Sequence, residues 1–125
     1  MKLALMVCVL TLMIGGVRAG EASGLTSGNE FLRQCSGLMQ AVDGGARDPE
    51  TLMRGTMCTG YMTAFSEMAL MLPESMKTFC IPEDASLLQT VRVAIKFLSQ
   101  RPELLNKAVL PGLIVGFTVA WPCKK

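Results

Sequence analysis

The longest helical pattern in the chain covers residues 48–72 and predicts one central helix. Asp48 is a favourable N-cap, and Pro49 suits the first helical position because an N–H there has no intrahelical partner. Pro73 ends the helix, since proline cannot continue it. At about 100° per residue, a cysteine falls in line with large apolar side chains. We expect this stripe to face the core: Cys58, Tyr61, Phe65, Met68 and Leu72.

A shorter helix is expected before the central one. Ser27 and Glu30 have the spacing of a capping box, in which each side chain satisfies a backbone donor of the first turn. Gly44 and Gly45 end this helix, so it folds back on the central helix as an antiparallel hairpin. Its predicted buried face consists of Phe31, Cys35, Leu38 and Val42.

Two more helical patterns follow, and the first is clearly amphipathic. Ser86 and Gln89 form a second capping box at its start. Its predicted buried residues are Leu88, Val91, Ile95 and Leu98, and its water-facing residues are Arg92, Lys96 and Gln100. The last helix is expected to begin at Pro102 and Glu103. No strand pattern is found, so the sequence predicts an all-α fold, a small bundle of about four helices stapled by disulfides.

The last helix is unusual because residues 108–123 contain no charged side chain. Pro111 removes one backbone hydrogen bond and is expected to kink the helix or to split it near Lys107. A helix that is apolar all round lies either in the centre of a core or against another subunit. Both alternatives stay open.

A second face of the central helix carries only small side chains. Such a face permits another helix to approach closely. We favour packing against a helix of the same domain over a self-association surface. The residues of this face are Gly55, Thr56, Thr59, Gly60, Thr63 and Ser66.

Residues 1–19 have the pattern of a cleaved secretory signal peptide. Lys2 is followed by an apolar run over residues 3–14 and by small residues that end at Ala19, and cleavage after Ala22 would also satisfy the small-residue rule. The run is too short to span a membrane. We therefore expect an exported, periplasmic protein with no membrane partner after the signal is removed.

Removal of the signal leaves the chain electrically neutral. The full chain has 12 Lys and Arg against 10 Asp and Glu. The signal takes away Lys2 and Arg18 and no acid, which leaves ten bases against ten acids. No basic surface for nucleic acid is expected, and a partner must be matched by local shape and charge.

The cysteine pattern predicts two disulfides. Cys8 leaves with the signal, and an even number of cysteines in a small exported domain indicates a disulfide framework. The hairpin brings Cys35 level with Cys58, since they lie eight residues before Asp43 and eight after Glu50. Of the three connectivities that four cysteines allow, we therefore favour Cys35–Cys58 and Cys80–Cys123.

The irregular segment over residues 73–84 is charged and carries Cys80. It is either a plain connection or a braced loop that presents a recognition surface with little ordering cost on binding. We place the partner-binding residues on this loop and on the exposed side of the next helix: Glu74, Lys77, Glu83, Asp84, Arg92 and Lys96.

The chain offers little catalytic chemistry. It contains no histidine, which removes the usual general base, zinc ligand and nucleophile partner. Its acids are scattered at caps, turns and solvent faces. We therefore expect no enzymatic activity, no metal and no cofactor.

The methionines of the central region could be copper ligands or core filler. Thioethers bind Cu(I), but only Met68 and Met71 are placed to share an ion, and methionine packs well in cores. We predict core filler. The residues are Met53, Met57, Met62, Met68, Met71 and Met76.

The combined motifs resemble the Rap/Tai family of immunity proteins, over residues 27–123. The matching features are Phe31-Leu32 with Cys35, Cys58-Thr59-Gly60-Tyr61, Phe79-Cys80-Ile81-Pro82, the Ser86 to Gln89 cap, Arg101-Pro102-Glu103-Leu104 and Trp121-Pro122-Cys123.

The resemblance implies a function. It points to a small helical periplasmic domain, often a homodimer, that plugs the active-site groove of a cognate peptidoglycan amidase effector of a type VI secretion system. The alternative is a periplasmic helical chaperone or general interaction domain without a toxin partner.

Overall fold

Four α-helices and two short 3-10 turns make up the computed structural model, which describes residues 25–124. In chain order they are α2 (Gly28–Val42), α3 (Pro49–Met71), η1 (Glu74–Met76), α4 (Leu87–Ser99), η2 (Pro102–Leu104) and α5 (Val109–Ala120). The all-α prediction is confirmed. The expected signal peptide over residues 1–19, or 1–22, lies outside the described residues. Between residues 25 and 124 no helix has the length and hydropathy to cross a membrane.

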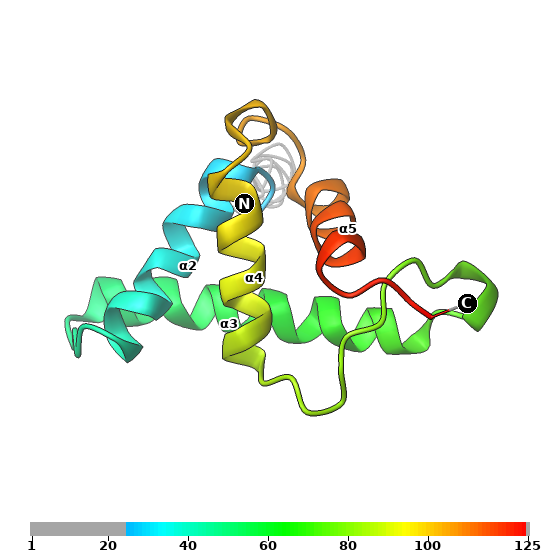
Figure 1. Cartoon of the computed structure of the whole chain (residues 1–125). Helices are drawn as coiled ribbons and strands as arrows, with labels where there is room; N and C mark the ends of the chain where they lie inside the picture. The colour runs from blue at the N-terminus through cyan, green and yellow to red at the C-terminus, as the bar shows by residue number, and fades with distance from the viewer. Residues whose placement is uncertain (1–24, 125) are drawn as a thin grey trace, which may run out of the picture.

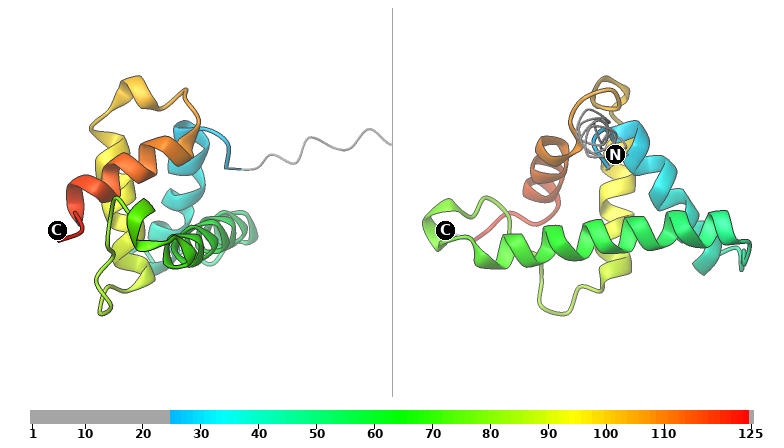
Figure 2. Two further views of the ribbon diagram at one scale, coloured as in Figure 1. Left: turned by 90° about the vertical axis from the view of Figure 1, so that its right-hand side faces the viewer. Right: turned by 180° about the vertical axis from the view of Figure 1, so that it is seen from behind.

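The long helix α3 runs across the molecule, and the other helices lie on one side of it (Figure 1). α2 folds back against α3, and α4 and α5 pack together. The right-hand view of Figure 2 shows the whole length of α3 in front of the other helices. One side of α3 therefore faces away from the bundle.

The predicted caps define the starts of three helices. The Ser27 Oγ accepts a hydrogen bond from the Glu30 N–H at 3.2 Å, and the Asp48 Oδ1 accepts one from the Thr51 N–H at 2.9 Å. The Ser86 Oγ accepts one from the Gln89 N–H at 3.1 Å. Each side chain satisfies a backbone donor that the helix leaves without a partner.

The α2–α3 hairpin is closely packed around a buried disulfide. Cys35 and Cys58 are joined, as the hairpin argument predicts, and both are fully buried. A Cβ added to Gly37 would lie 2.6 Å from the Arg54 Cβ, and one added to Gly55 would lie 3.2 Å from the Leu38 Cα. Only glycine fits at Gly37. Gly55 belongs to the predicted small-residue face, and its close contact with α2 explains why a small residue stands there.

The buried face of α3 differs from the predicted stripe. Met62 is fully buried, whereas Met68 is exposed and Leu72 only half-buried. The buried positions are Thr51, Gly55, Cys58, Met62 and Phe65. α3 has apolar residues on several sides, so its own pattern does not select the covered side; the positions of α2 and α4 select it.

The core-filler prediction is wrong for most of the methionines. Met62 alone among the six is buried. The other five are exposed because they lie on the outer side of α3 or beyond its end: Met53, Met57, Met68, Met71 and Met76. Val42, also predicted to be buried, is 50% exposed because it ends α2 where the hairpin turns into solvent.

The last helix starts later than predicted. Pro102 begins only η2, and α5 begins at Val109. The predicted last helix is therefore split into two elements rather than kinked. Pro111 lies in the first turn of α5, where its missing N–H costs no intrahelical bond. One face of α5 is buried through Val109, Leu113 and Phe117. The other face exposes Leu110, Val115 and Val119, so α5 is not buried all round.

We predict that Gly37→Ala destabilises the protein by about 1–3 kcal/mol, because the new methyl group overpacks the α2–α3 contact. Gly60→Ala is the control, since a Cβ at Gly60 has no atom within 4 Å. It should raise the free energy of unfolding by about 0.5–1 kcal/mol, the usual gain for alanine over glycine inside a helix. Urea unfolding of dilute protein measures both. Equal effects of the two substitutions would contradict the packing argument.

The Asp48 cap predicts a pH dependence of stability. Hydrogen bonds from the Thr51 backbone and side chain lower the pKa of Asp48. Its contribution to stability is therefore full above the unfolded-state pKa of about 3.9 and is lost as the pH falls through the lower folded-state value. Asp48→Ala should lower the melting temperature at pH 7, and the deficit should shrink below about pH 4. Asp48→Asn keeps an acceptor oxygen, so it should lower the melting temperature less than Asp48→Ala does. A deficit independent of pH would contradict this assignment.

Candidate functional site

The segment between α3 and α4 contains four of the six residues predicted to bind a partner. Glu74 lies in η1, Lys77 follows it, and Glu83 and Asp84 are exposed further along. Lys77 forms an ion pair with Glu74 within the loop. The loop therefore presents both signs of charge to solvent.

The C-terminal tail holds this loop in place. Cys80 and Cys123 are joined by the second disulfide, and the Cys80 N–H donates a hydrogen bond to the Trp121 carbonyl oxygen at 2.8 Å. Phe79 and Pro122 form an isolated antiparallel bridge beside it. Figure 1 shows the tail after α5 running alongside the loop. Covalent and backbone bonds thus fix the middle of the loop.

Phe79 anchors the loop in the core. Its side chain is only 6% exposed, and its ring centroid lies 5.6 Å from that of Phe65 and 5.6 Å from that of Phe117. Phe117 in turn stacks on Trp121 at 5.5 Å. Aromatic pairs at these distances add to the free energy gained from burial. The loop is therefore ordered before any partner binds.

A cleft of about 480 Å³ opens beside the anchored loop. Its walls come from the C-terminal half of α3, from the loop and from the start of α4. Among these residues are Ser66, Glu67, Leu70, Lys77, Ile81 and Glu83. The Ser66 Oγ is buried and has no hydrogen-bond partner. The cleft is mostly apolar and offers three charged groups, from Glu67, Lys77 and Glu83, whereas the Ser66 Oγ lies beneath its surface.

The cleft includes some of the residues predicted from the sequence. Lys77 and Glu83 line it, and Glu74 is connected to it through its ion pair with Lys77. Asp84 is exposed next to Glu83 but is not part of the wall. Arg92 and Lys96 also lie outside the wall, and the Arg92 Nη2 donates to the Asp43 Oδ1 at 2.7 Å. Arg92 links α4 to the end of α2 instead.

Sequence analysis missed the part of the cleft that α3 provides. Ser66 belongs to the small-residue face predicted above. No pattern in the sequence marks Glu67 or Leu70 as site residues. A clue was present in Thr63, Ser66 and Ala69, three small side chains that recur every third residue near the end of α3 and line the cleft. Small residues next to a disulfide-braced loop leave space beneath it.

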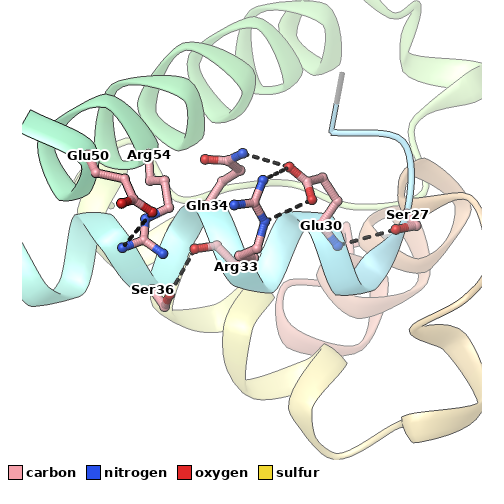
Figure 3. Close-up of polar contacts among 7 residues, drawn as sticks. All are labelled: Ser27, Glu30, Arg33, Gln34, Ser36, Glu50 and Arg54. Atoms are coloured by element: carbon pink, nitrogen blue, oxygen red, sulfur yellow. Dashed lines mark hydrogen bonds and ion pairs between the residues drawn. The ribbon is translucent and has the colours of Figure 1, made fainter. Parts of the chain in front are cut away.

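A second polar cluster lies along α2, and its groups largely satisfy one another (Figure 3). The Glu30 carboxylate accepts hydrogen bonds from Arg33 at 2.8 and 3.0 Å and from Gln34 at 2.6 Å. These hydrogen bonds lower the pKa of Glu30, and the bond from Arg33 has the largest effect. The hydrogen bond with Glu30 raises the pKa of Arg33. Arg54 approaches Glu50 at 3.8 Å. The cluster stabilises local structure, but the Gln34 Oε1 and the Arg54 Nε are buried in it without a hydrogen-bond partner.

One tyrosine near the core has a shifted pKa. Burial raises the pKa of Tyr61, and Tyr61 does not line the cleft. Within residues 25–124, no three metal-binding side chains lie close enough together to hold an ion.

Comparison with known proteins identifies the family. A family model for Rap1a immunity proteins matches residues 27–123, most of the chain. No curated protein and no solved structure matches. The matched region contains α2 to α5, both disulfides and the cleft. The chain therefore belongs to the Rap1a immunity protein family.

Proposed function

We propose that this chain is a periplasmic immunity protein that binds a peptidoglycan amidase delivered by a type VI secretion system and blocks its active-site groove. Family membership supports the general class, an immunity protein with a secreted effector as partner. The two disulfides fit a protein that works outside the cytoplasm. The observation that carries the proposal is the braced loop with its adjoining cleft.

The loop is suited to act as a plug because it is already ordered. Phe79 in the core and the disulfide at Cys80 hold its middle, while Glu83 and Asp84 stay exposed. A loop ordered in advance loses little conformational entropy on binding, so more of the contact energy appears as affinity. Covering a groove excludes substrate without any reaction. In this proposal the chain has no catalytic activity and needs no cofactor.

The cleft gives the partner a second point of attachment. An apolar side chain of the amidase would enter beside Ile81 and Leu70 and bury apolar surface that is open to water in the free protein. Lys77 and Glu83 line the cleft and would select the partner by charge.

The exposed apolar residues keep a second function open, a periplasmic chaperone or general interaction domain. Leu70, Met71 and Met76 are large side chains largely open to solvent near the end of α3. A chaperone should suppress the aggregation of unrelated unfolded clients, whereas an immunity protein should not. Light scattering of a heat-denatured client protein separates the two functions. From the family resemblance we also propose that the chain forms a homodimer.

Charge reversal on the loop should weaken inhibition. We predict that Glu83→Lys and Asp84→Lys each raise the concentration needed to inhibit the amidase encoded beside this gene by at least about tenfold, because a like charge then faces the partner. Digestion of purified peptidoglycan gives the readout. Glu103→Lys in η2 is the control, because it makes the same charge change on an exposed residue outside the cleft. Equal inhibition by all three variants would place the contact elsewhere.

Removal of the loop disulfide should weaken binding more than it disturbs the helices. We predict that the double variant Cys80→Ser and Cys123→Ser keeps its helical circular dichroism but binds the same amidase roughly tenfold more weakly, since its loop must be ordered on binding. Removing Cys35 and Cys58 instead should also lower stability, by about 3 kcal/mol against about 4 kcal/mol for the longer segment that Cys80 and Cys123 close. It leaves the loop attached, so the affinity of the folded protein should change less. Undiminished affinity after loss of Cys80–Cys123 would contradict the plug mechanism.

A further inference from the structure

Two carboxylates of the cleft have no partner in the part of the chain that the structure describes. Glu67 and Glu83 line the cleft and are exposed, and within residues 25–124 neither forms an ion pair. The third charged group of the wall, Lys77, is paired with Glu74. The charge of Lys77 is therefore offset. The mouth of the cleft carries a net negative charge, although the whole chain has a formal charge of +2.

The cations on the surrounding elements leave these carboxylates unpaired. Arg92 on α4 is already paired with a carboxylate of its own, and Lys96 does not line the cleft. Lys124 in the C-terminal tail does not line it either. Asp84, exposed beside Glu83, adds a further negative charge. A cationic group of another molecule is therefore the charge that complements this cleft.

Two ordered elements hold the carboxylates in place. Glu67 stands on the long helix α3. Glu83 lies in a turn that is closed by a hydrogen bond of 3.0 Å from the Ala85 N–H to the Pro82 carbonyl oxygen. The disulfide at Cys80 fixes the chain just before this turn. Because the carboxylates come from different walls of one cleft, a cation between these walls is attracted by both.

The rest of the wall is apolar and offers few free hydrogen-bonding groups. Leu70, Ile81 and Leu87 supply apolar surface. The Thr90 Oγ1 donates to the Leu87 carbonyl oxygen at 2.6 Å, and the Ser66 Oγ lies beneath the surface. A ligand that fits this cleft therefore needs an apolar part for the wall and a positive charge for the mouth.

Among protein side chains, arginine fits these requirements best. Its aliphatic stem covers apolar surface while its guanidinium stays near water. The planar guanidinium carries several N–H donors and can pair with two carboxylates at once, which makes arginine the usual choice for such ion pairs. The cleft volume of about 480 Å³ also leaves room for an apolar side chain next to the arginine.

We propose that the cleft takes an arginine side chain of the effector, with its aliphatic stem against Leu70 and Ile81 and its guanidinium beside Glu67 and Glu83. The inference rests on the proposed function, since it identifies a group of the amidase that the cleft binds. It gives Glu67 a role in choosing the partner. Effectors with a neutral or acidic side chain at this position would bind more weakly.

The first test examines the cleft without an amidase. The probe is n-butylguanidinium, which has the stem and head of arginine, and its binding to isotope-labelled, oxidised protein is followed through backbone amide chemical shifts. Amides at Leu70, Ile81 and Glu83 should shift saturably, with a dissociation constant of roughly 1–50 mM. Pentanoate, with a similar stem and a negative head, should shift them at least about fivefold less. No saturable shift with about 200 mM probe, or equal shifts with pentanoate, would overturn the proposal.

Two matched variants assign the probe binding to the carboxylates. The double variant Glu67→Gln and Glu83→Gln should raise the dissociation constant of n-butylguanidinium at least about fivefold, the loss expected for two exposed ion pairs. Glu103→Gln is the control, because Glu103 is exposed in η2 and does not line the cleft. It should leave the dissociation constant unchanged. Equal binding by the double variant and the control would overturn the proposal.

The second test locates the arginine on the effector. Each exposed arginine of the amidase encoded beside this gene is replaced by glutamine, and its affinity for the wild type and for Glu67→Gln is measured by calorimetry. One replacement should lower the affinity for the wild type at least about tenfold and the affinity for Glu67→Gln clearly less, because a direct pair is not additive. Additive losses for every arginine would overturn this inference and leave the inhibition itself intact. No binding between the wild type and the amidase would instead contradict the proposed function, which the probe titration does not involve.

Discussion

The contact of Phe79 with Phe65 and Phe117 attaches the loop that forms one wall of the cleft to α3 and α5. Phe65 belongs to α3, Phe79 to the loop and Phe117 to α5. Buried aromatic rings contribute strongly to core stability, and here they also determine where an otherwise irregular segment lies. The disulfide at Cys80, one residue further on, makes the same attachment covalent. Without this contact the loop would still connect α3 to α4, but it would not form one wall of a cleft.

The three sides of α3 have different environments because the helix is long and the bundle covers only part of it. The inner side carries Cys58, Met62 and Phe65 and forms the core. A second side, with Ser66 and Leu70, lines the cleft. The outer side contacts no other described element. One helix thus presents three surfaces that do not overlap: a core face, a cleft wall and an exposed apolar face.

In the proposed function the site acts through shape and local charge. The chain has no histidine, and the perturbed carboxyl groups, Glu30 and Asp48, lie in local hydrogen bonds at helix starts. A protein that inhibits by covering a groove needs a stiff surface and few chemical groups. Disulfides supply that stiffness in a domain whose core is small.

Local chemistry determined much of this protein. Ser27, Asp48 and Ser86 fixed the starts of three helices, because a cap depends only on residues three positions apart. The hairpin also predicted the Cys35–Cys58 pairing. The loop predicted Lys77 and Glu83 as partner-binding residues; both line the cleft, and their role in binding stays a prediction. Tertiary structure alone decided which side of α3 is buried, why Arg92 pairs with Asp43, and that Ser66 lines a cleft. These features depend on contacts between residues far apart in the chain, and an apolar helix with several equivalent sides carries no local signal that selects among them.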